Sequence, residues 1–191
     1  MRDGTHKRGI RIYRAADSED LIDTNFMRLS KPPARLTSAS PATLKLLTRE
    51  PDGFSLVHCW FKENYPLGRH THDVDCMYYV ISGSAIMGSQ TLFPGDSFFV
   101  PAGSPYKYTS GPEGVEVLEI RHGVDQFDVQ PQNDAGHAEK RDAAVATNQE
   151  SWAPILRRPS GPKARVRMSG ASTKAHWWGC WAFWRPKLEK N

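Results

Sequence analysis

The residues best suited to chemistry lie in a stretch rich in strand-forming residues, between positions 54 and 122. His70 and His72 are separated by a single residue, and side chains two positions apart on a strand share a face. If that face is the interior of the protein, the two imidazoles form half of a chelate for iron, zinc, copper, nickel or manganese. The alternative is a pair of histidines on the surface or in the core that bind nothing.

Positions 75 and 76 carry two further candidate metal ligands. Cys76 keeps the same facing as His70 and His72, so its thiolate could complete the site and would favour zinc or copper. It could equally be a small apolar residue of the core. Asp75 reaches the same face only if a β-bulge shifts the strand by one residue; otherwise it points into solvent.

Two tyrosines in this stretch are further candidates, and Tyr78 shares the facing of His70, His72 and Cys76. Tyr106 could bind a metal as phenolate, hydrogen-bond a substrate, or act as an acid or base. Tyr78 follows Cys76 by two residues and is a candidate base or substrate contact. The alternative for both is packing in the core, with the hydroxyls bonded to the backbone.

A charged pair on the last strand of this stretch is a further candidate. Glu119 and Arg121 share one face of the strand, and Arg121 could hold a substrate carboxylate. Glu119, His58 and His122 could each replace a missing metal ligand, although Glu119 and His122 have opposite facing in a regular strand. An outward salt bridge is the alternative for Glu119 and Arg121.

The elements that position these residues are short strands separated by turns rich in Gly and Pro, from Phe54 onward. We expect strands at 54–61 and near 69–72, 75–81, 84–87, 90–93, 97–100, 106–109 and 115–122. Such a series predicts an antiparallel sandwich or closed barrel. Outside it we expect a strand at 10–13, a short helix at about 19–28, a strand or turn at 41–48, and an exposed helix at 134–149.

Two motifs in this stretch resemble those of the cupin family. The first is a Gly, His-x-His, a Glu and a later Gly, and here Gly68, His70, His72 and Gly83 match it, with Cys76 at the Glu position. The second is a Gly, five residues, Pro-x-Gly, two residues and a His. It is matched by Gly95, Pro101 and Gly103, with Tyr106 at the His position.

The resemblance implies an all-β fold: a single cupin double-stranded β-helix, or jelly-roll barrel, with a short N-terminal helix and a C-terminal extension. We therefore expect an N-terminal extension at 1–53, the barrel core at 54–124, a polar linker or helix at 125–159 and a C-terminal arm at 160–191.

The resemblance also implies a metal site and an activity. One divalent transition metal would be held by His70 and His72 with help from Cys76, Asp75 or Tyr106. Catalytic or substrate-contacting roles would fall to four residues: Tyr106, Tyr78, Arg121 and Glu119. Many small cupins are dioxygenases, so the resemblance suggests oxidation of an aromatic or small organic acid.

Two other kinds of function remain open. The altered ligand set makes a redox-neutral lyase, isomerase or cyclase an alternative, and the spacing of Tyr78 is also seen in cupin lyases that cleave dimethylsulfoniopropionate. A non-catalytic cupin that binds a ligand or a partner is a further alternative. We expect a homodimer with a small-molecule substrate.

The composition of the chain indicates its cellular location. No apolar run reaches the roughly 18 residues that a membrane span needs, and the first residues lack the apolar core of a secretory signal. Three cysteines without a scaffold spacing fit a reducing cytoplasm. The chain is thus expected to be a cytoplasmic protein.

The last 41 residues differ from the rest in charge and aromatic content. Nine of the 25 Lys and Arg residues, one of the 21 acidic residues and five of the six tryptophans lie at 151–191. Such a segment could pack on a barrel or a neighbouring subunit, bind nucleic acid, or lie on an acidic membrane surface. We favour packing, because no zinc-finger or helix-turn-helix pattern supports nucleic acid.

Overall fold

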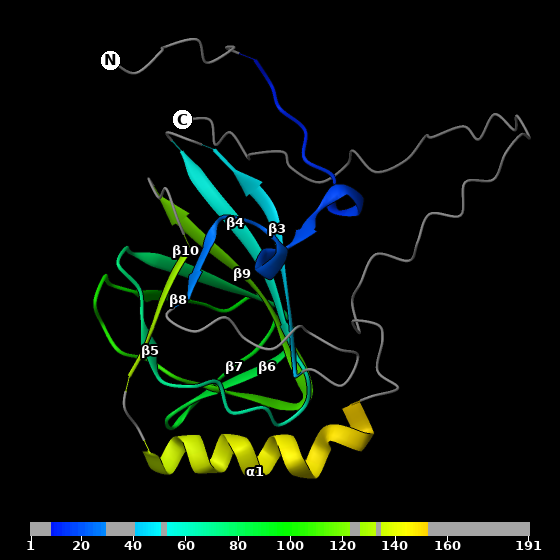
Figure 1. The fold of residues 1–191 in the computed structure, drawn as a ribbon, viewed down its shortest axis with the longest axis vertical. Coiled ribbons are helices and arrows are strands. Elements are labelled where there is room, and N and C mark those ends of the chain that lie inside the picture. The colour runs from blue at the N-terminus through cyan, green and yellow to red at the C-terminus, as the bar shows by residue number, and fades with distance from the viewer. Residues whose placement is uncertain (1–8, 30–40, 51–52, 123–126, 133–134, 153–191) are drawn as a thin grey trace, which may run out of the picture. The chain divides into compact units, whose positions relative to one another are not determined.

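The computed structural model describes residues 9–29, 41–50, 53–122, 127–132 and 135–152, all in the first of the two units into which the chain divides, Met1–Gly161 (Figure 1). The expected arm at 160–191 lies outside the described residues. The strands are β1 (Glu19–Asp20), β2 (Met27–Leu29), β3 (Ala42–Arg49), β4 (Phe54–Phe61), β5 (His70–Thr71), β6 (Cys76–Met87), β7 (Gln90–Leu92), β8 (Ser97–Val100), β9 (Thr109–His122) and β10 (Phe127–Pro131). The helices are the 3-10 turns η1 (Ala15–Asp17) and η2 (Leu21–Asp23), and α1 (Ala135–Trp152).

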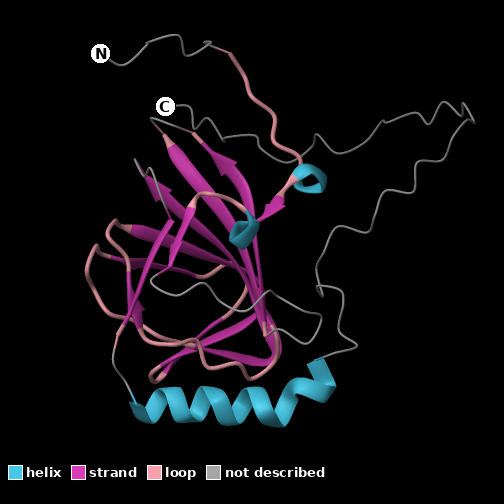
Figure 2. Cartoon of the chain, viewed as in Figure 1, coloured by secondary structure: helices cyan, strands magenta, loops and turns pink. Residues whose placement is uncertain are grey.

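The strands form two sheets. The larger sheet has the order β1-β3-β4-β9-β6-β7, with β8 also paired to β6, and all its pairs are antiparallel. In the smaller sheet β10 lies between β2, to which it is parallel, and β5, to which it is antiparallel. The predicted all-β barrel of cupin type is confirmed (Figure 2).

The core follows from the alternation of side chains along three adjacent strands of the larger sheet. Alternate residues along part of each strand are buried in one cluster: Val57, Cys59 and Phe61 of β4, Cys76, Tyr78 and Val80 of β6, and Val115 and Val117 of β9. This face of the sheet is the interior of the barrel, as period-2 patterning requires.

Close packing of β6 on β9 depends on two glycines. Gly83 and Gly114 both have positive φ, at 67° and 77°. A Cβ at Gly83 would collide with the carbonyl oxygen of Gly114, and one at Gly114 would lie 2.6 Å from the carbonyl oxygen of Phe61. Only glycine satisfies both conditions without strain, which explains the last glycine of the first motif.

Several element predictions need correction. The helix expected at about 19–28 is wrong: η2 is a single 3-10 turn between β1, which pairs with β3, and β2, which pairs with β10. Residues 10–13 form no strand. The strands expected at 75–81 and 84–87 are one strand, β6, because bulges in its pairing with β9 absorb the turn signal at Gly83.

Strands β3 and β10, like β1 and β2, lie outside the expected core at 54–124 and belong to the sheets. Residues 41–48, expected as a strand or turn, lie mostly in β3, which pairs along the length of β4. β10 pairs with β5 and so lies next to His70 and Thr71. Both strands are therefore part of the framework that surrounds the barrel interior.

Helix α1 confirms the helix expected at 134–149, and its last residue anchors it. The carbonyl oxygen of Trp152 accepts a hydrogen bond from Nζ of Lys62 at 2.8 Å. The fully buried Trp152 ring also packs edge-on against Tyr65. The first tryptophan of the basic segment thus packs against the barrel; the other four lie outside the described residues. None of the helices in the described ranges has the length and apolar character needed to span a bilayer.

Candidate functional site

Backbone hydrogen bonds bring the two motifs together. The Pro101–Gly103 turn of the second motif docks on the first, where Gly103 N–H donates to the carbonyl oxygen of His72 at 2.8 Å. Residues 70 and 106 form an isolated bridge in which each backbone N–H donates to the other's carbonyl, at 3.2 and 3.1 Å. The site is therefore built where the end of β5 meets the loop after β8.

Both histidines are held with their Nε2 atoms directed into the interior. Nδ1 of His70 donates to the carbonyl of Gly68, and Nδ1 of His72 donates to the carbonyl of Asp128, each at 2.7 Å. Backbone acceptors of this kind fix the tautomer and ring orientation in metal-binding histidines. The ring centroids are 4.8 Å apart, which confirms that the two side chains project together.

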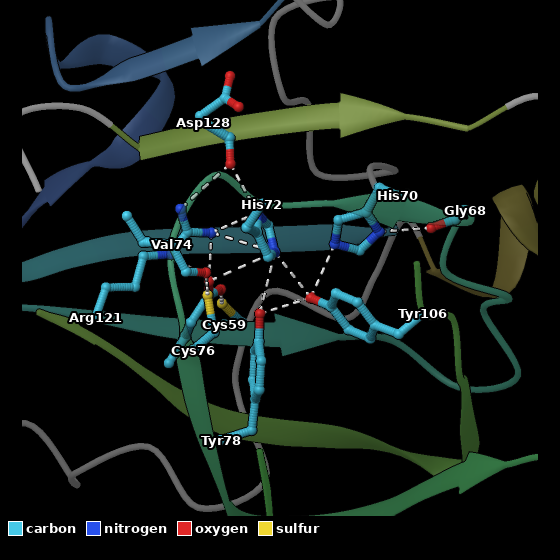
Figure 3. Close-up of polar contacts among 11 residues, drawn as sticks. Cys59, Gly68, His70, His72, Val74, Cys76, Tyr78, Tyr106, Arg121 and Asp128 are labelled. Atoms are coloured by element: carbon cyan, nitrogen blue, oxygen red, sulfur yellow. Dashed lines mark hydrogen bonds and ion pairs between the residues drawn. The ribbon is translucent and has the colours of Figure 1, made fainter. Parts of the chain in front are cut away.

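Two tyrosine hydroxyls meet the histidine nitrogens (Figure 3). The Tyr106 hydroxyl lies 2.8 Å from Nε2 of His70, 3.0 Å from Nε2 of His72 and 2.5 Å from the Tyr78 hydroxyl. The Tyr78 hydroxyl is also 3.2 Å from Nε2 of His72. Two phenolic protons thus serve four short contacts, so the cluster can redistribute protons without moving heavy atoms.

A buried ion pair lies beside His72. Nε of Arg121 donates to Oε1 of Glu119 at 2.6 Å, Nη2 forms an ion pair with the same oxygen at 2.5 Å, and both residues are almost completely buried. The same oxygen is 3.7 Å from Nε2 of His72. Of the two facings that the sequence left open for this pair, the structure has the inward one.

The guanidinium of Arg121 is fixed from two further directions. Its Nη1 donates to the carbonyl of Asp128 at 3.2 Å, and its central carbon lies 3.6 Å from the centre of the Phe127 ring. Its Nη2 lies 2.8 and 3.2 Å from the two ring nitrogens of His72. At these distances an Nη2 atom in the plane of the imidazole would collide with the carbon between the two nitrogens. Nη2 of Arg121 therefore lies over the face of the His72 ring.

Three buried residues could hold a metal ion. Ligand atoms of His72, Cys76 and Glu119 all lie within 4.8 Å of one another. Ligand atoms around a tetrahedral zinc at about 2.0–2.3 Å lie about 3.3–3.8 Å apart, so the three side chains would have to move closer together by up to about 1 Å. The donors (imidazole nitrogen, sulfur and carboxylate oxygen) suit zinc, and the residues present therefore fit a metal.

Burial keeps the site uncharged apart from the Glu119–Arg121 pair. It lowers the pKa of His72 from 6.5 to about 4, with Arg121 and His70 adding to the effect and Glu119 opposing it, and it lowers the pKa of His70. Burial, reinforced by Glu119, raises the pKa of Cys76 to about 12 and the pKa of Tyr78 and Tyr106 well above 10. Metal binding at Cys76 would consequently release a proton.

The net pKa of Arg121 is raised. Burial lowers it, but the Glu119 carboxylate and the nearby Cys76 and Tyr78 outweigh that effect. The guanidinium therefore stays charged inside the barrel, and it requires a negative partner there.

Three of the sequence candidates lie outside the interior cluster. Asp75 is exposed, because the strand has no bulge at this point, and its Oδ1 accepts the N–H of Ala102 at 2.8 Å. Its role as a metal ligand is not supported; it secures the turn that carries Tyr106. His122 is exposed and packs against Phe54, and His58 is buried on the other face of β4, 3.8 Å from Glu116.

Sequence reasoning missed Cys59, Phe127 and the carbonyl of Asp128. The sulfur of Cys59 lies 3.9 Å from Oε2 of Glu119, so thiols flank this carboxylate from two strands. Alternation along residues 54–61 was a signal that Cys59 faces inward. Phe127 and Asp128 could not be found, because nothing local pairs β10 with β5.

A family model described as a domain of unknown function (DUF4437) matches residues 30–156. The match spans more than half of the chain, and the chain belongs to this family. No curated protein matches this chain.

Similar solved structures include several cupins. The polyketide cyclase RemF from Streptomyces resistomycificus has 18% identity and a TM-score of 0.49, with 76% of this chain and 99% of that chain covered. The dimethylsulfoniopropionate (DMSP) lyase DddQ from Ruegeria pomeroyi has 19% identity and a TM-score of 0.47, covering 56% and 62% of the two chains. An RmlC-like cupin from Shewanella frigidimarina has 21% identity and a TM-score of 0.40, covering 44% and 78%.

Proposed function

We propose that this protein is a metal-dependent enzyme that catalyses a redox-neutral reaction on a small molecule, as a lyase, isomerase or cyclase. The observation that carries the proposal is the position of His72. Its Nε2 contacts both phenols and lies 3.7 Å from Oε1 of Glu119, and a ring nitrogen of His72 lies within 4.8 Å of the Cys76 and Glu119 ligand atoms. A metal held by His72, Cys76 and Glu119 would act as a Lewis acid that polarises a substrate oxygen.

Tyr106 and Tyr78 supply the proton-transfer chemistry. Both phenols are neutral, because burial raises their pKa, and each can donate to a substrate oxygen. Their 2.5 Å contact allows the proton lost by one to be replaced by the other. His70 accepts from Tyr106 through Nε2 at 2.8 Å and is the group that can return the proton to it.

The donor set favours redox-neutral chemistry over the dioxygenase reaction that the motifs also suggest. A thiol beside one carboxylate and one imidazole is a zinc-type set, whereas oxygen-activating iron sites are built from histidines and carboxylates. The second-motif histidine is replaced by Tyr106, whose hydroxyl is engaged with two imidazoles. The dioxygenase remains the alternative that the experiment must distinguish.

The test uses zinc, which has no redox chemistry of its own. Metal-free protein is loaded with zinc, iron(II) or no metal and incubated in deuterium oxide, with and without oxygen, with a panel of small hydroxy and keto acids. We expect deuterium incorporation or product formation, followed by nuclear magnetic resonance, with zinc and not without metal. Activity only with iron and oxygen would support the dioxygenase, and no turnover with any metal would support a binding protein.

Matched variants make the assignment specific. Tyr106→Phe should lower the zinc-dependent rate by about 100-fold, the usual contribution of a positioned acid or base, with zinc affinity retained. Tyr79→Phe is the control, because Tyr79 lies on the exposed face of the same sheet. Equal losses in the two variants would argue against a role for the phenol pair.

The expected homodimer belongs to this proposal. Met77 and Tyr79 on β6 and Phe99 on β8 are exposed on the outer face of the barrel, where Met77 and Phe99 are paired across the strands. Exposed apolar patches of this kind support a protein interface. Sedimentation analysis of the wild type and of Phe99→Ser should show a dimer that the substitution weakens.

A further inference from the structure

Arg121 is paired inside the barrel with Glu119. Glu119 uses one oxygen, Oε1, for both Nε and Nη2 of Arg121. That oxygen is also the one measured at 3.7 Å from Nε2 of His72. Glu119 therefore cannot bind a metal through this oxygen and keep both its hydrogen bond and its ion pair with Arg121.

We propose that Arg121 is the receptor for a carboxylate group of the substrate, a place that Glu119 fills in the structure and would leave on becoming a metal ligand. The inference rests on the proposed function, since it assigns the substrate class of that same site. Glu119 would then exchange one cation for another, and the guanidinium would bind the substrate anion.

The geometry of the pair supports an exchange. A guanidinium edge binds a carboxylate best when each N–H has its own oxygen, in the bidentate arrangement. Here Nε and Nη2 share a single oxygen of Glu119, so a substrate carboxylate with two oxygens would satisfy the same edge more completely.

Arg121 would remain in place when Glu119 moves. Its contacts with the Phe127 ring, the Asp128 carbonyl and the face of His72 do not involve Glu119. Its charge could not stay without an anion in an interior where it is 1% exposed. Replacement of Glu119 by a substrate carboxylate would leave Arg121 in its position and keep its charge paired.

The position of Arg121 connects the substrate anion to the proton network. Tyr106 is only partly buried, whereas His70, His72, Cys76, Tyr78, Glu119 and Arg121 are buried, so Tyr106 is the most exposed member of the cluster. Arg121 lies over the face of His72, and both phenols contact Nε2 of that ring. A carboxylate on Arg121 would therefore lie beside the ring that both phenols contact.

The experiment measures binding of propionate, with neutral propionamide as the control ligand, by calorimetry on metal-free protein. Glu119→Gln removes the internal competitor and should bind propionate at least about tenfold more tightly than the wild type, within the usual range of coupling between sites. Glu116→Gln is the matched control, since Glu116 is a buried carboxylate on the opposite face of β9. The double variant Glu119→Gln/Arg121→Met should lose the gain.

A second measurement needs no substitution. Zinc should increase the modification of Arg121 in the wild type by an arginine-specific dicarbonyl reagent, as mapped by mass spectrometry, and propionate should protect it again. By linkage, propionate should raise the affinity for zinc by the factor by which zinc raises the affinity for propionate.

The outcomes separate this inference from the proposed function. Wild-type protein that binds zinc, with no gain for propionate in Glu119→Gln and no zinc-dependent modification of Arg121, would overturn the exchange and leave the metal site standing. Protein that binds no zinc would overturn the proposed function and the exchange with it, even if Glu119→Gln binds propionate.

Discussion

The interior of the barrel has two halves that are built on the same strands and differ in chemistry. Toward one end, β4, β6 and β9 contribute Phe61, Val80, Val115 and Val117, all buried and apolar. Toward the other end, β6 and β9 contribute Cys76, Tyr78, Glu119 and Arg121, equally buried. Both halves lie on the same antiparallel strands, β6 and β9, so pairing of the strands does not require the polar set.

The polar half of the interior contributes less to stability than the apolar half, which indicates that its residues serve function. Apolar burial contributes roughly 25 cal/mol per Å², whereas a buried ion pair is often no better than apolar residues of the same volume. The polar half therefore stabilises the protein less than an apolar replacement could. Substitutions in each half test this difference between the apolar and the polar interior.

Removal of one member of the buried ion pair should have the largest effect. Arg121→Met leaves the Glu119 carboxylate buried without its cation and should lower the free energy of unfolding by about 3–5 kcal/mol. The double variant Glu119→Gln/Arg121→Met should recover most of that loss. Chemical denaturation checks both, and a double variant as unstable as the single one would mean that the pair itself holds the barrel together.

Acid should destabilise the metal-free protein through His72. Between pH 6.5 and about 4 the unfolded chain binds a proton that folded His72 does not, so the free energy of unfolding falls as pH falls. The contribution is on the order of 3 kcal/mol. His72→Gln should flatten this part of the pH profile, and the exposed His122→Gln should not. Identical profiles for wild type and His72→Gln would contradict the burial of a neutral imidazole.

A cavity in the apolar half should lower stability without affecting metal binding. Val117→Ala should cost about 2 kcal/mol, from lost apolar burial and the remaining cavity, with unchanged affinity for zinc. Denaturation and zinc titration on the same sample provide the check. A parallel loss of zinc affinity would show that the two halves are not independent.

Loss of one phenol should have the smallest effect on folding. Tyr106→Phe removes a hydroxyl that contacts two imidazoles and Tyr78, yet the Tyr78 hydroxyl can still donate to His72. We expect about 1 kcal/mol in the free energy of unfolding. A cost as large as that of Arg121→Met would assign Tyr106 a structural role in place of a chemical one.

Local patterns were sufficient to predict much of the barrel. Alternation predicted that His70 and His72 project together and that Cys76 and Tyr78 share one face, and it placed Glu119 and Arg121 on a common face without deciding which face that was. The Gly and Pro signals located the turns at Gly95 and Gly103, where φ is positive, but the signal at Gly83 marks a bulge within β6.

Long-range pairing was not predictable in the same way. The short pattern after Asp17 indicated a helix, but pairing of β1 with β3 and of β2 with β10 overrides that local preference. The roles of Phe127 and the Asp128 carbonyl arise only because β10 crosses beside β5. The exchange of partners by Glu119 depends on which of its two oxygens faces His72, and no sequence pattern records that.

The most direct test of a metal site at His72, Cys76 and Glu119 is a cobalt(II) titration followed by absorbance, in a Cys180→Ser background. We predict a thiolate-to-cobalt charge-transfer band in the parent protein, which should be lost in Cys76→Ser. The band should be retained in Cys59→Ser, because among the described residues only Cys76 lies with His72 and Glu119 in the cluster of candidate ligands. Absence of the band from the parent protein, or a band that depends on Cys59 and not on Cys76, would contradict a metal site at His72, Cys76 and Glu119.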